Sequence, residues 1–160
     1  MYKSRDLMKM IVINENSKPK GKVKEIFFDI NEKKLIGFEI ASMYIWRKKN
    51  FIKCSNIINI AGKIRVSKFT AFTPDERDFV INHEVYNHEG ILLGNISEVL
   101  IDEKNYNISA FIVTPGIIEK FVLGKIIILA SDIYKKGNYI MYKNKSSIKF
   151  TSMVHEEKRL

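Results

Sequence analysis

The sequence lacks any long hydrophobic run. Its longest uninterrupted apolar stretch is Ile126 to Ala130, whereas a membrane-spanning helix needs roughly 18 apolar residues. The N-terminal residues lack the apolar core of a secretory signal, and Cys54 is the only cysteine, so no disulfide can form within the chain. With 46% hydrophobic and 28% charged residues among 160, the composition is that of a folded protein. We expect a cytoplasmic protein without a membrane span.

Arginine and nucleotide-binding glycine motifs are also scarce. Only five of the 27 cationic residues are arginines, and arginine is the residue suited to bidentate recognition of guanine or phosphate. Any contact with a polyanion is therefore expected to be electrostatic and only weakly sequence-specific. The eight glycines form neither GxGxxG nor GxxxxGK[ST]. Because no nucleophile, base and orienting group come together in the sequence, we expect no enzymatic activity, no cofactor and no metal.

The excess of positive charge is confined to the first half of the chain. Residues 1–72 contain 16 Lys+Arg and 6 Asp+Glu, a balance of +10, and residues 73–160 contain 11 and 12, a balance of −1. The sum is the net charge of +9. Compositional drift toward lysine is one explanation, and a selected basic surface is the other.

An internal repeat relates the two halves. An offset of 73 places residues 21–29 over residues 94–102, and an offset of 76 places residues 51–57 over residues 127–133. The second copy has therefore gained three residues, near Pro115. Identical pairs mark the alignment: Gly21 and Gly94, Glu25 and Glu98, and Asp29 and Asp102.

Each copy has the pattern of short β-strands, rich in Val, Ile, Phe and Tyr and broken by turn residues. We predict an all-β fold of two tandem small β-barrels, the first over residues 1–72 and the second over residues 73–150, with a tail at residues 151–160. Thr73, Pro74 and Glu76 have the spacing of a helix start, which predicts a short helical linker. A unit this small buries too little surface to be robust alone, so each half is expected to be less stable than the pair.

The residues that define the repeat resemble a PRC-barrel domain. The first copy carries the pattern in residues 21–29, 35–40 and 55–66, and the second carries Gly124-Lys125 before residues 126–129 and then Ser131-Asp132-Ile133. The resemblance covers residues 3–145 and implies a small, strongly bent barrel that binds proteins or ribonucleoproteins without catalysis. Short tandem PRC-barrel proteins of bacteria, some associated with sporulation, are similar. So is the PRC-barrel part of the bacterial small-subunit ribosome maturation factor.

The first candidate binding feature is a lysine-rich strand. Lys20, Lys22 and Lys24 would share one face of a strand, with Val23 on the other. The aligned positions in the second copy carry no lysine, so the fold does not require it. The alternatives are a surface for a polyanion or acidic partner, and lysines that protect an edge strand from pairing.

The second candidate feature places Trp46, the only tryptophan, beside Arg47, Lys48 and Lys49. An aromatic ring next to cations can stack on a base or lie at a membrane interface while the cations hold phosphates. The alternative is a hairpin whose Trp packs on the barrel while the charges are solvated.

Other polar residues are assigned structural or surface positions. His83 and His88 are five apart, which is not the spacing of two zinc ligands on a helix, so both are expected at the surface. Asp29 and Asp102 stand where a carboxylate can accept backbone N–H groups of a turn. Cys54 aligns with Ala130 and is expected to be a small buried residue.

From the sequence we therefore expect a non-enzymatic binding or adaptor protein whose basic first barrel docks a protein partner. The alternative is an RNA-binding or ribosome-assembly factor. The identity of the partner and the existence of a homo-oligomer stay open.

Overall fold

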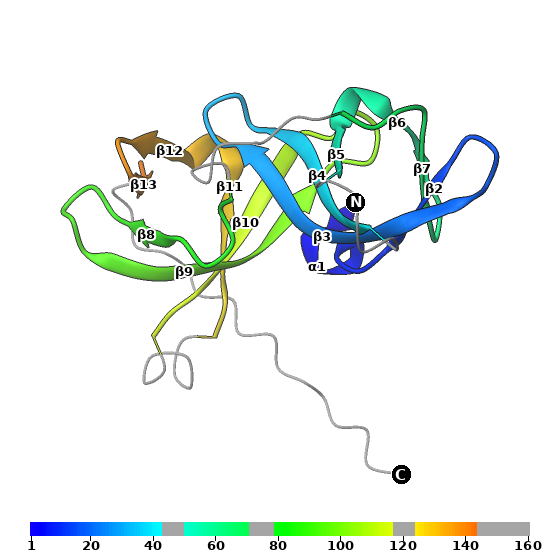
Figure 1. Ribbon diagram of the computed structural model, residues 1–160. Helices are drawn as coiled ribbons and strands as arrows, with labels where there is room; N and C mark the ends of the chain where they lie inside the picture. Colours follow the sequence, from blue (N-terminus) through cyan, green and yellow to red (C-terminus); the bar gives the residue numbers. More distant parts are fainter. Residues whose placement is uncertain (43–49, 71–78, 117–123, 144–160) are drawn as a thin grey trace, which may run out of the picture.

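The computed structural model describes residues 1–42, 50–70, 79–116 and 124–143. These residues form two bent, mostly antiparallel sheets with very little helix (Figure 1), which confirms the all-β prediction and the two similar units. The predicted linker helix at residues 73–76 lies outside the described residues, as does the predicted tail.

The first sheet contains six strands, and its order is β5-β4-β3-β2-β7-β6. The strands are β2 (Ile11–Asn14), β3 (Pro19–Asp29), β4 (Lys34–Ser42), β5 (Asn50–Lys53), β6 (Ile57–Ile60) and β7 (Ile64–Val66). A single 3-10 turn, Cys54–Asn56, joins the two end strands β5 and β6. Along β3, buried and exposed residues alternate up to Lys24 and then give way to a continuous buried run, because the end of this strand lies against the other half.

The second sheet repeats this arrangement. Its path is β11-β10-β9-β8-β13-β12, through β8 (Glu84–Tyr86), β9 (Leu92–Ile101), β10 (Ile108–Thr114), β11 (Ile126–Leu129), β12 (Ile133–Lys136) and β13 (Tyr139–Tyr142). The 3-10 turn Ala130–Asp132 corresponds to Cys54–Asn56. In both sheets the path is strongly bent and interrupted by β-bulges (Figure 1), which are the usual means of curving a sheet. Within the described chain, each sheet contains one parallel pair, β2 with β7 and β8 with β13. Among the described residues, the first and last strands of each path do not pair with each other through backbone hydrogen bonds.

Two equivalent turns join the halves. The N–H of Leu35 donates to the carbonyl of Tyr106 at 3.1 Å, and the N–H of Ile108 donates to the carbonyl of Lys33 at 2.7 Å. Both pairs are related by the offset of 73, and Lys34 and Asn107 form an antiparallel bridge between them. The contact therefore has the symmetry of a twofold axis. Buried side chains of both halves form one continuous hydrophobic core.

The beginning of the chain crosses to the second sheet. Strand β1 (Tyr2–Lys3) pairs with β9, and the short helix α1 (Ser4–Leu7) follows it. The Ser4 Oγ accepts the Val99 N–H at 2.9 Å, and Arg5 Nε lies 3.5 Å from a buried oxygen of Glu98. The sequence did not predict this crossing, since β1 and α1 are too short to leave a periodic pattern.

Candidate binding surfaces

The β2–β3 and β8–β9 turns have the same backbone structure. In the first, Asn14 Oδ1 accepts the Lys18 N–H, and in the second, Asn87 Oδ1 accepts the Ile91 N–H, both at 2.8 Å. The same residues also form backbone bonds, at 3.1 and 2.9 Å. The two ends of the molecule therefore share one framework, and the side chains on them can be compared position by position.

Strand β3 presents lysines on its outer face. Val23 is 2% exposed in the core, while Lys22 and Lys24 are exposed and Lys20 is half-buried, which confirms the predicted alternation. Strand β3 lies between β2 and β4, so the interpretation of these lysines as guards of an edge strand is wrong. The hydrogen-bonding edges of β3 are already occupied.

Lys24 differs from its two neighbours because it is shared between carboxylates. Its Nζ lies 3.6 Å from an oxygen of Glu25 and 3.5 Å from an oxygen of Glu39. These two acids face each other across β3 and β4, and Glu39 is only 8% exposed. Like charges in opposed positions destabilise a sheet, so Lys24 has a structural role whatever else it binds.

Two further cations, Lys63 and Arg65, extend the lysine face. Strand β7 runs parallel to β2 and places Arg65 opposite Ile13. Arg65 Nη1 donates to the Glu15 carbonyl at 2.8 Å. Together with neighbouring residues, these cations line a shallow pocket of about 280 Å³; the lining residues are Ile13, Ser17, Asn59, Ala61, Lys63 and Arg65.

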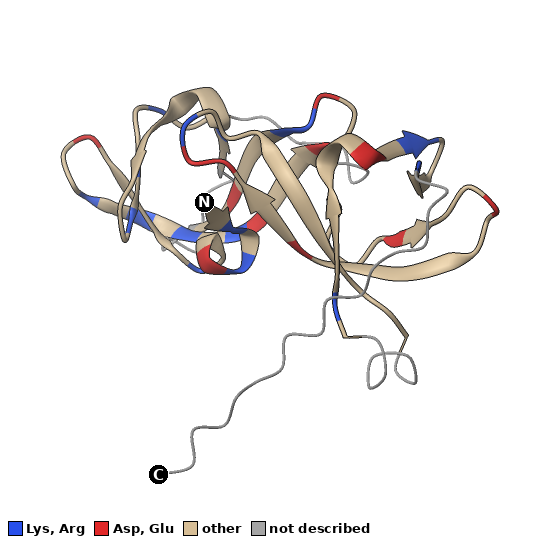
Figure 2. Cartoon of the chain, turned by 180° about the vertical axis from the view of Figure 1, so that it is seen from behind, with Lys and Arg blue, Asp and Glu red and all other residues tan. Residues whose placement is uncertain are grey.

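We call this surface the basic face and define it as Lys18, Lys20, Lys22, Lys63 and Arg65. Lys22 and Arg65 share one side of the sheet, because Lys22 is opposite the exposed Ile11 and Arg65 is opposite Ile13, two positions along β2. Lys20 is two residues before Lys22 on β3, Lys63 immediately precedes β7, and Lys18 immediately precedes β3. Figure 2 shows the blue positions along β3 and in the neighbouring turns. Within the described part of the chain, the lysines of the basic face form no ion pair.

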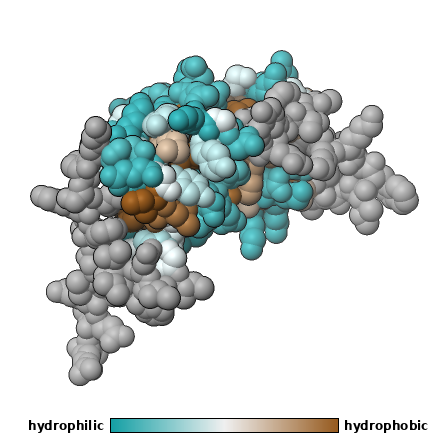
Figure 3. Space-filling model, turned by 90° about the vertical axis from the view of Figure 1, so that its left-hand side faces the viewer, coloured by the Kyte–Doolittle hydropathy of each residue, from teal (hydrophilic) through white to brown (hydrophobic). Residues whose placement is uncertain are grey.

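The five equivalent positions in the second half carry no cation, although Lys135 stands where the first half has Asn59. The positions that match the basic face, in the same order, hold Ile91, Leu93, Asn95, Tyr139 and Met141. Ile91 is 57% exposed and Tyr139 is 61% exposed, and the Tyr139 ring packs edge-on against that of Tyr86, with centroids 5.7 Å apart. In Figure 3 apolar side chains are exposed among polar ones at this end of the molecule. One framework thus displays two chemically different surfaces.

The second sequence candidate cannot be compared with this surface. Trp46, Arg47, Lys48 and Lys49 lie outside the described residues, so their predicted role stays a prediction.

Cys54 is half-buried in the 3-10 turn before β6. Burial raises the pKa of the Cys54 thiol to about 11, so the thiol is protonated at neutral pH and is a poor nucleophile. Among the described residues, no group of three or more His, Cys, Asp and Glu side chains could hold a metal ion.

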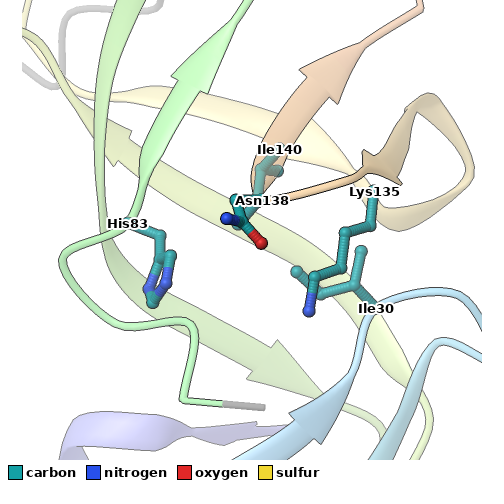
Figure 4. A pocket seen from close by; sticks show the side chains of 5 residues that line it. All are labelled: Ile30, His83, Lys135, Asn138 and Ile140. Atoms are coloured by element: carbon teal, nitrogen blue, oxygen red, sulfur yellow. The ribbon is translucent and has the colours of Figure 1, made fainter. Parts of the chain in front are cut away.

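A second pocket, of about 210 Å³, lies where the end of β3 meets the second sheet. Figure 4 shows His83 and Lys135 on opposite sides of it, with Asn138 and Ile140 between them and Ile30 of the first half below. Its volume is below the roughly 300 Å³ at which organic ligand sites begin. The pocket is therefore too small for most cofactors.

Comparison with known families supports the repeat. The profile of the PRC-barrel domain matches residues 1–71 and 78–145, and no curated protein matches the chain. In the part of the chain that the structure describes, no helix has the length and hydrophobicity needed to span a membrane. The two matches together cover most of the sequence, and the chain therefore belongs to the PRC-barrel domain family, with two copies in tandem.

Proposed function

We propose that the protein is a non-enzymatic adaptor that binds an acidic segment of another protein through its basic face. One observation carries this proposal: the matching surface of the second half, built on the same backbone turn, has apolar or amide side chains where the basic face has lysine or arginine. The fold is thus formed without these cations, and their presence in one half calls for a reason outside folding.

The geometry of the basic face suits an extended acidic partner. Lys20 and Lys22 follow one strand, and Lys63 and Arg65 lie on or beside a second strand that reaches the same side of the sheet through β2. Arg65 is held in place by the Glu15 carbonyl and the Ser17 hydroxyl, at 2.8 and 3.2 Å. Clustered charges of one sign attract a partner of the opposite sign and speed association at low salt.

RNA is the alternative partner. Lysines without fixed geometry hold phosphates as point charges, and single-stranded RNA binding adds aromatic side chains on which bases stack. The described residues that line the pocket beside Lys63 and Arg65 include no aromatic side chain. This composition favours an acidic protein over RNA, and it supports a role in docking rather than in base recognition.

A photo-cross-linking experiment with a matched control tests the proposal. A photoreactive residue replaces Lys22 in one full-length protein and Asn95, its equivalent on the second half, in another. We expect the Lys22 position, and not the Asn95 position, to capture a protein through a segment rich in Asp and Glu. Capture mainly of RNA would support the alternative. The same products from both positions would refute a role specific to the basic face.

A further inference from the structure

Arg65 is the one arginine of the basic face, and two hydrogen bonds hold its guanidinium in place. Its Nη1 donates to the Glu15 carbonyl at 2.8 Å and to the Ser17 hydroxyl at 3.2 Å. Both bonds use the same terminal nitrogen, and among the described residues no acceptor meets the other edge, formed by Nε and Nη2. Glu15 contacts Arg65 through its carbonyl, and the two form no ion pair in the described structure. An open, pre-oriented guanidinium edge suits two parallel hydrogen bonds to one anionic group.

Ser17 has a backbone conformation that a glycine adopts more easily. Its φ is +61°, and the equivalent Gly90 of the second half has a φ of +82°. The Ser17 N–H donates to the Asn14 carbonyl at 2.9 Å, just as the Gly90 N–H donates to the Asn87 carbonyl at 3.0 Å. A side chain is unfavourable in this left-handed region, and the second half shows that glycine fits the same turn. The serine hydroxyl therefore has a reason outside the turn, and its bond to Arg65 supplies that reason.

The shallow pocket of the basic face gathers polar groups around Arg65. Arg65 lies opposite Ile13 of β2 and opposite Asn59 of β6, so the three side chains stand in one row across the sheet. Lys63 and Ser17 line the same pocket. Two cations, an amide and a hydroxyl thus surround a volume of about 280 Å³, which is just below the volume of sites for organic ligands. The pocket suits one anionic group rather than a whole small molecule.

The second half lacks this combination of side chains. Met141 stands at the position of Arg65, Tyr139 at that of Lys63 and Gly90 at that of Ser17. The guanidinium, the ammonium group and the hydroxyl are therefore absent together from the equivalent positions. Because these three groups line one pocket in the first half, their joint presence there indicates one ligand rather than general positive charge.

We propose that this pocket binds a phosphorylated serine or threonine within the acidic segment. The inference rests on the proposed function, since it names what the basic face recognises in that segment. A phosphate group carries nearly two negative charges at neutral pH and has three acceptor oxygens, which matches the two cations. The Nε and Nη2 edge of Arg65 holds two of these oxygens, while Lys63 and the Asn59 amide supply further donors. Lys20 and Lys22 then attract the acidic residues that flank the phosphate.

Three peptides separate the phosphate from general charge. The first is a poly-glutamate peptide with one central serine, and the second carries phosphoserine at that place. The third has two further glutamates instead of the phosphate and so has nearly the same charge as the second. Fluorescence anisotropy with the full-length protein at moderate salt gives the three affinities. We expect the phosphopeptide to bind at least about tenfold more tightly than either of the other peptides.

Two variants act inside the pocket and a third serves as the matched control. Arg65→Lys keeps the charge but removes the planar fork, so the preference for the phosphopeptide should fall to about twofold or less. Ser17→Gly removes the hydroxyl that positions Arg65 while it relieves the backbone, and it should also lower this preference. Lys22→Gln removes a charge of the basic face outside the pocket. It should weaken the binding of all three peptides and leave their ratios unchanged.

The outcomes separate this inference from the proposed function. If the serine peptide binds but the phosphopeptide binds less than about twofold more tightly than the peptide of equal charge, this inference fails and the proposed function stands. An undiminished preference in Arg65→Lys would also overturn the inference, as would inorganic phosphate that binds as tightly as the phosphopeptide. Failure of all three peptides to bind would overturn the proposed function as well.

The NMR signal of the Arg65 Nε–H gives a second readout that needs no variant. Saturation with the phosphopeptide should shift this signal, because Nε donates directly to the phosphate. The signal of Arg5, which pairs with Glu98, serves as the internal control and should not move. An Arg65 signal that stays in place at saturation would contradict the proposed contact.

Discussion

Replacing Asp29 or Asp102 by alanine tests how the two halves are held together. Asp29 is the last residue of β3, and Asp102 directly follows β9. The Oδ1 of each accepts the N–H groups two and three residues later, at 2.9 and 2.9 Å for Asp29 and at 2.7 and 3.2 Å for Asp102. Each turn then presents a carbonyl, from Lys33 or Tyr106, to the opposite half. Loss of either carboxylate should therefore loosen both the turn and the contact between the halves.

The expected cost of each single substitution is about 1–2 kcal/mol. A side chain that caps two backbone N–H groups stabilises by this amount when it is partly exposed, and both aspartates are half-buried. For a chain of this size, a loss of 1 kcal/mol lowers the Tm by about 2–4 °C. Urea unfolding followed by circular dichroism gives the free energy directly.

The controls use the symmetry of the repeat. Asp29→Asn and Asp102→Asn keep an acceptor oxygen and should recover most of the stability. Because the two turns meet at the contact between the halves, the double alanine variant should depart from additivity by about 0.5 kcal/mol or more. A loss of less than about 0.3 kcal/mol on substitution by alanine at both sites would contradict this role of the aspartates, as would an asparagine variant that is as unstable as the alanine variant.

Three further predictions concern single sites. At pH 8 the Cys54 thiol should be alkylated about 100-fold more slowly than a thiol with the ordinary pKa of 9.0. Its alkylation rate should rise about tenfold per pH unit toward pH 11. An alkylation rate typical of a free thiol would contradict the burial of Cys54. A Cβ at Gly37 would lie 1.9 Å from a backbone oxygen of β5, so Gly37→Ala should lower the free energy of unfolding by about 3 kcal/mol. Gly62 has a φ of +67° and open space around it, so Gly62→Ala should lower the free energy of unfolding by only about 1 kcal/mol. Equal losses for the two variants in thermal unfolding would refute the clash at Gly37. Arg5→Ala leaves the buried Glu98 carboxylate without its cation and should lower the free energy of unfolding by about 1–2 kcal/mol. Glu98→Gln in the same chain should restore part of this loss. No restoration in urea unfolding would argue against a stabilising ion pair between Arg5 and Glu98.

The sequence was sufficient for the local features that recur in both halves. Alternation along β3 placed Val23 inside and its lysine neighbours outside, and the aspartates before turns accept backbone N–H groups as predicted. The alignment also paired Ile64 with Ile140, and both are buried. These features depend on residues close together in the chain, where periodicity and turn chemistry are informative.

Features that depend on which strands become neighbours could not be predicted. The parallel pairing of β2 with β7 brings Arg65 within one strand of the lysine strand β3, although more than 40 residues of chain separate them. Antiparallel pairing with both β2 and β4 makes β3 a central strand and contradicts the edge-strand interpretation. The pairing of Lys24 with Glu39 likewise follows from the β3–β4 register. A closer comparison of the repeat would have found one signal, because Lys63 aligns with Tyr139 at the offset of 76.

We propose that the basic face, and not the net charge of the chain, binds the acidic partner. The direct measurement is the affinity for a poly-glutamate peptide, at low and at moderate salt, of the wild type and of two triple variants with the same loss of charge. One variant changes Lys20, Lys22 and Lys63 to Gln, and the other changes the exposed Lys104, Lys125 and Lys136 of the second half. We predict that the first variant loses binding and its salt dependence while the second keeps both. Equal losses in the two variants, or no loss in the first, would contradict the claim.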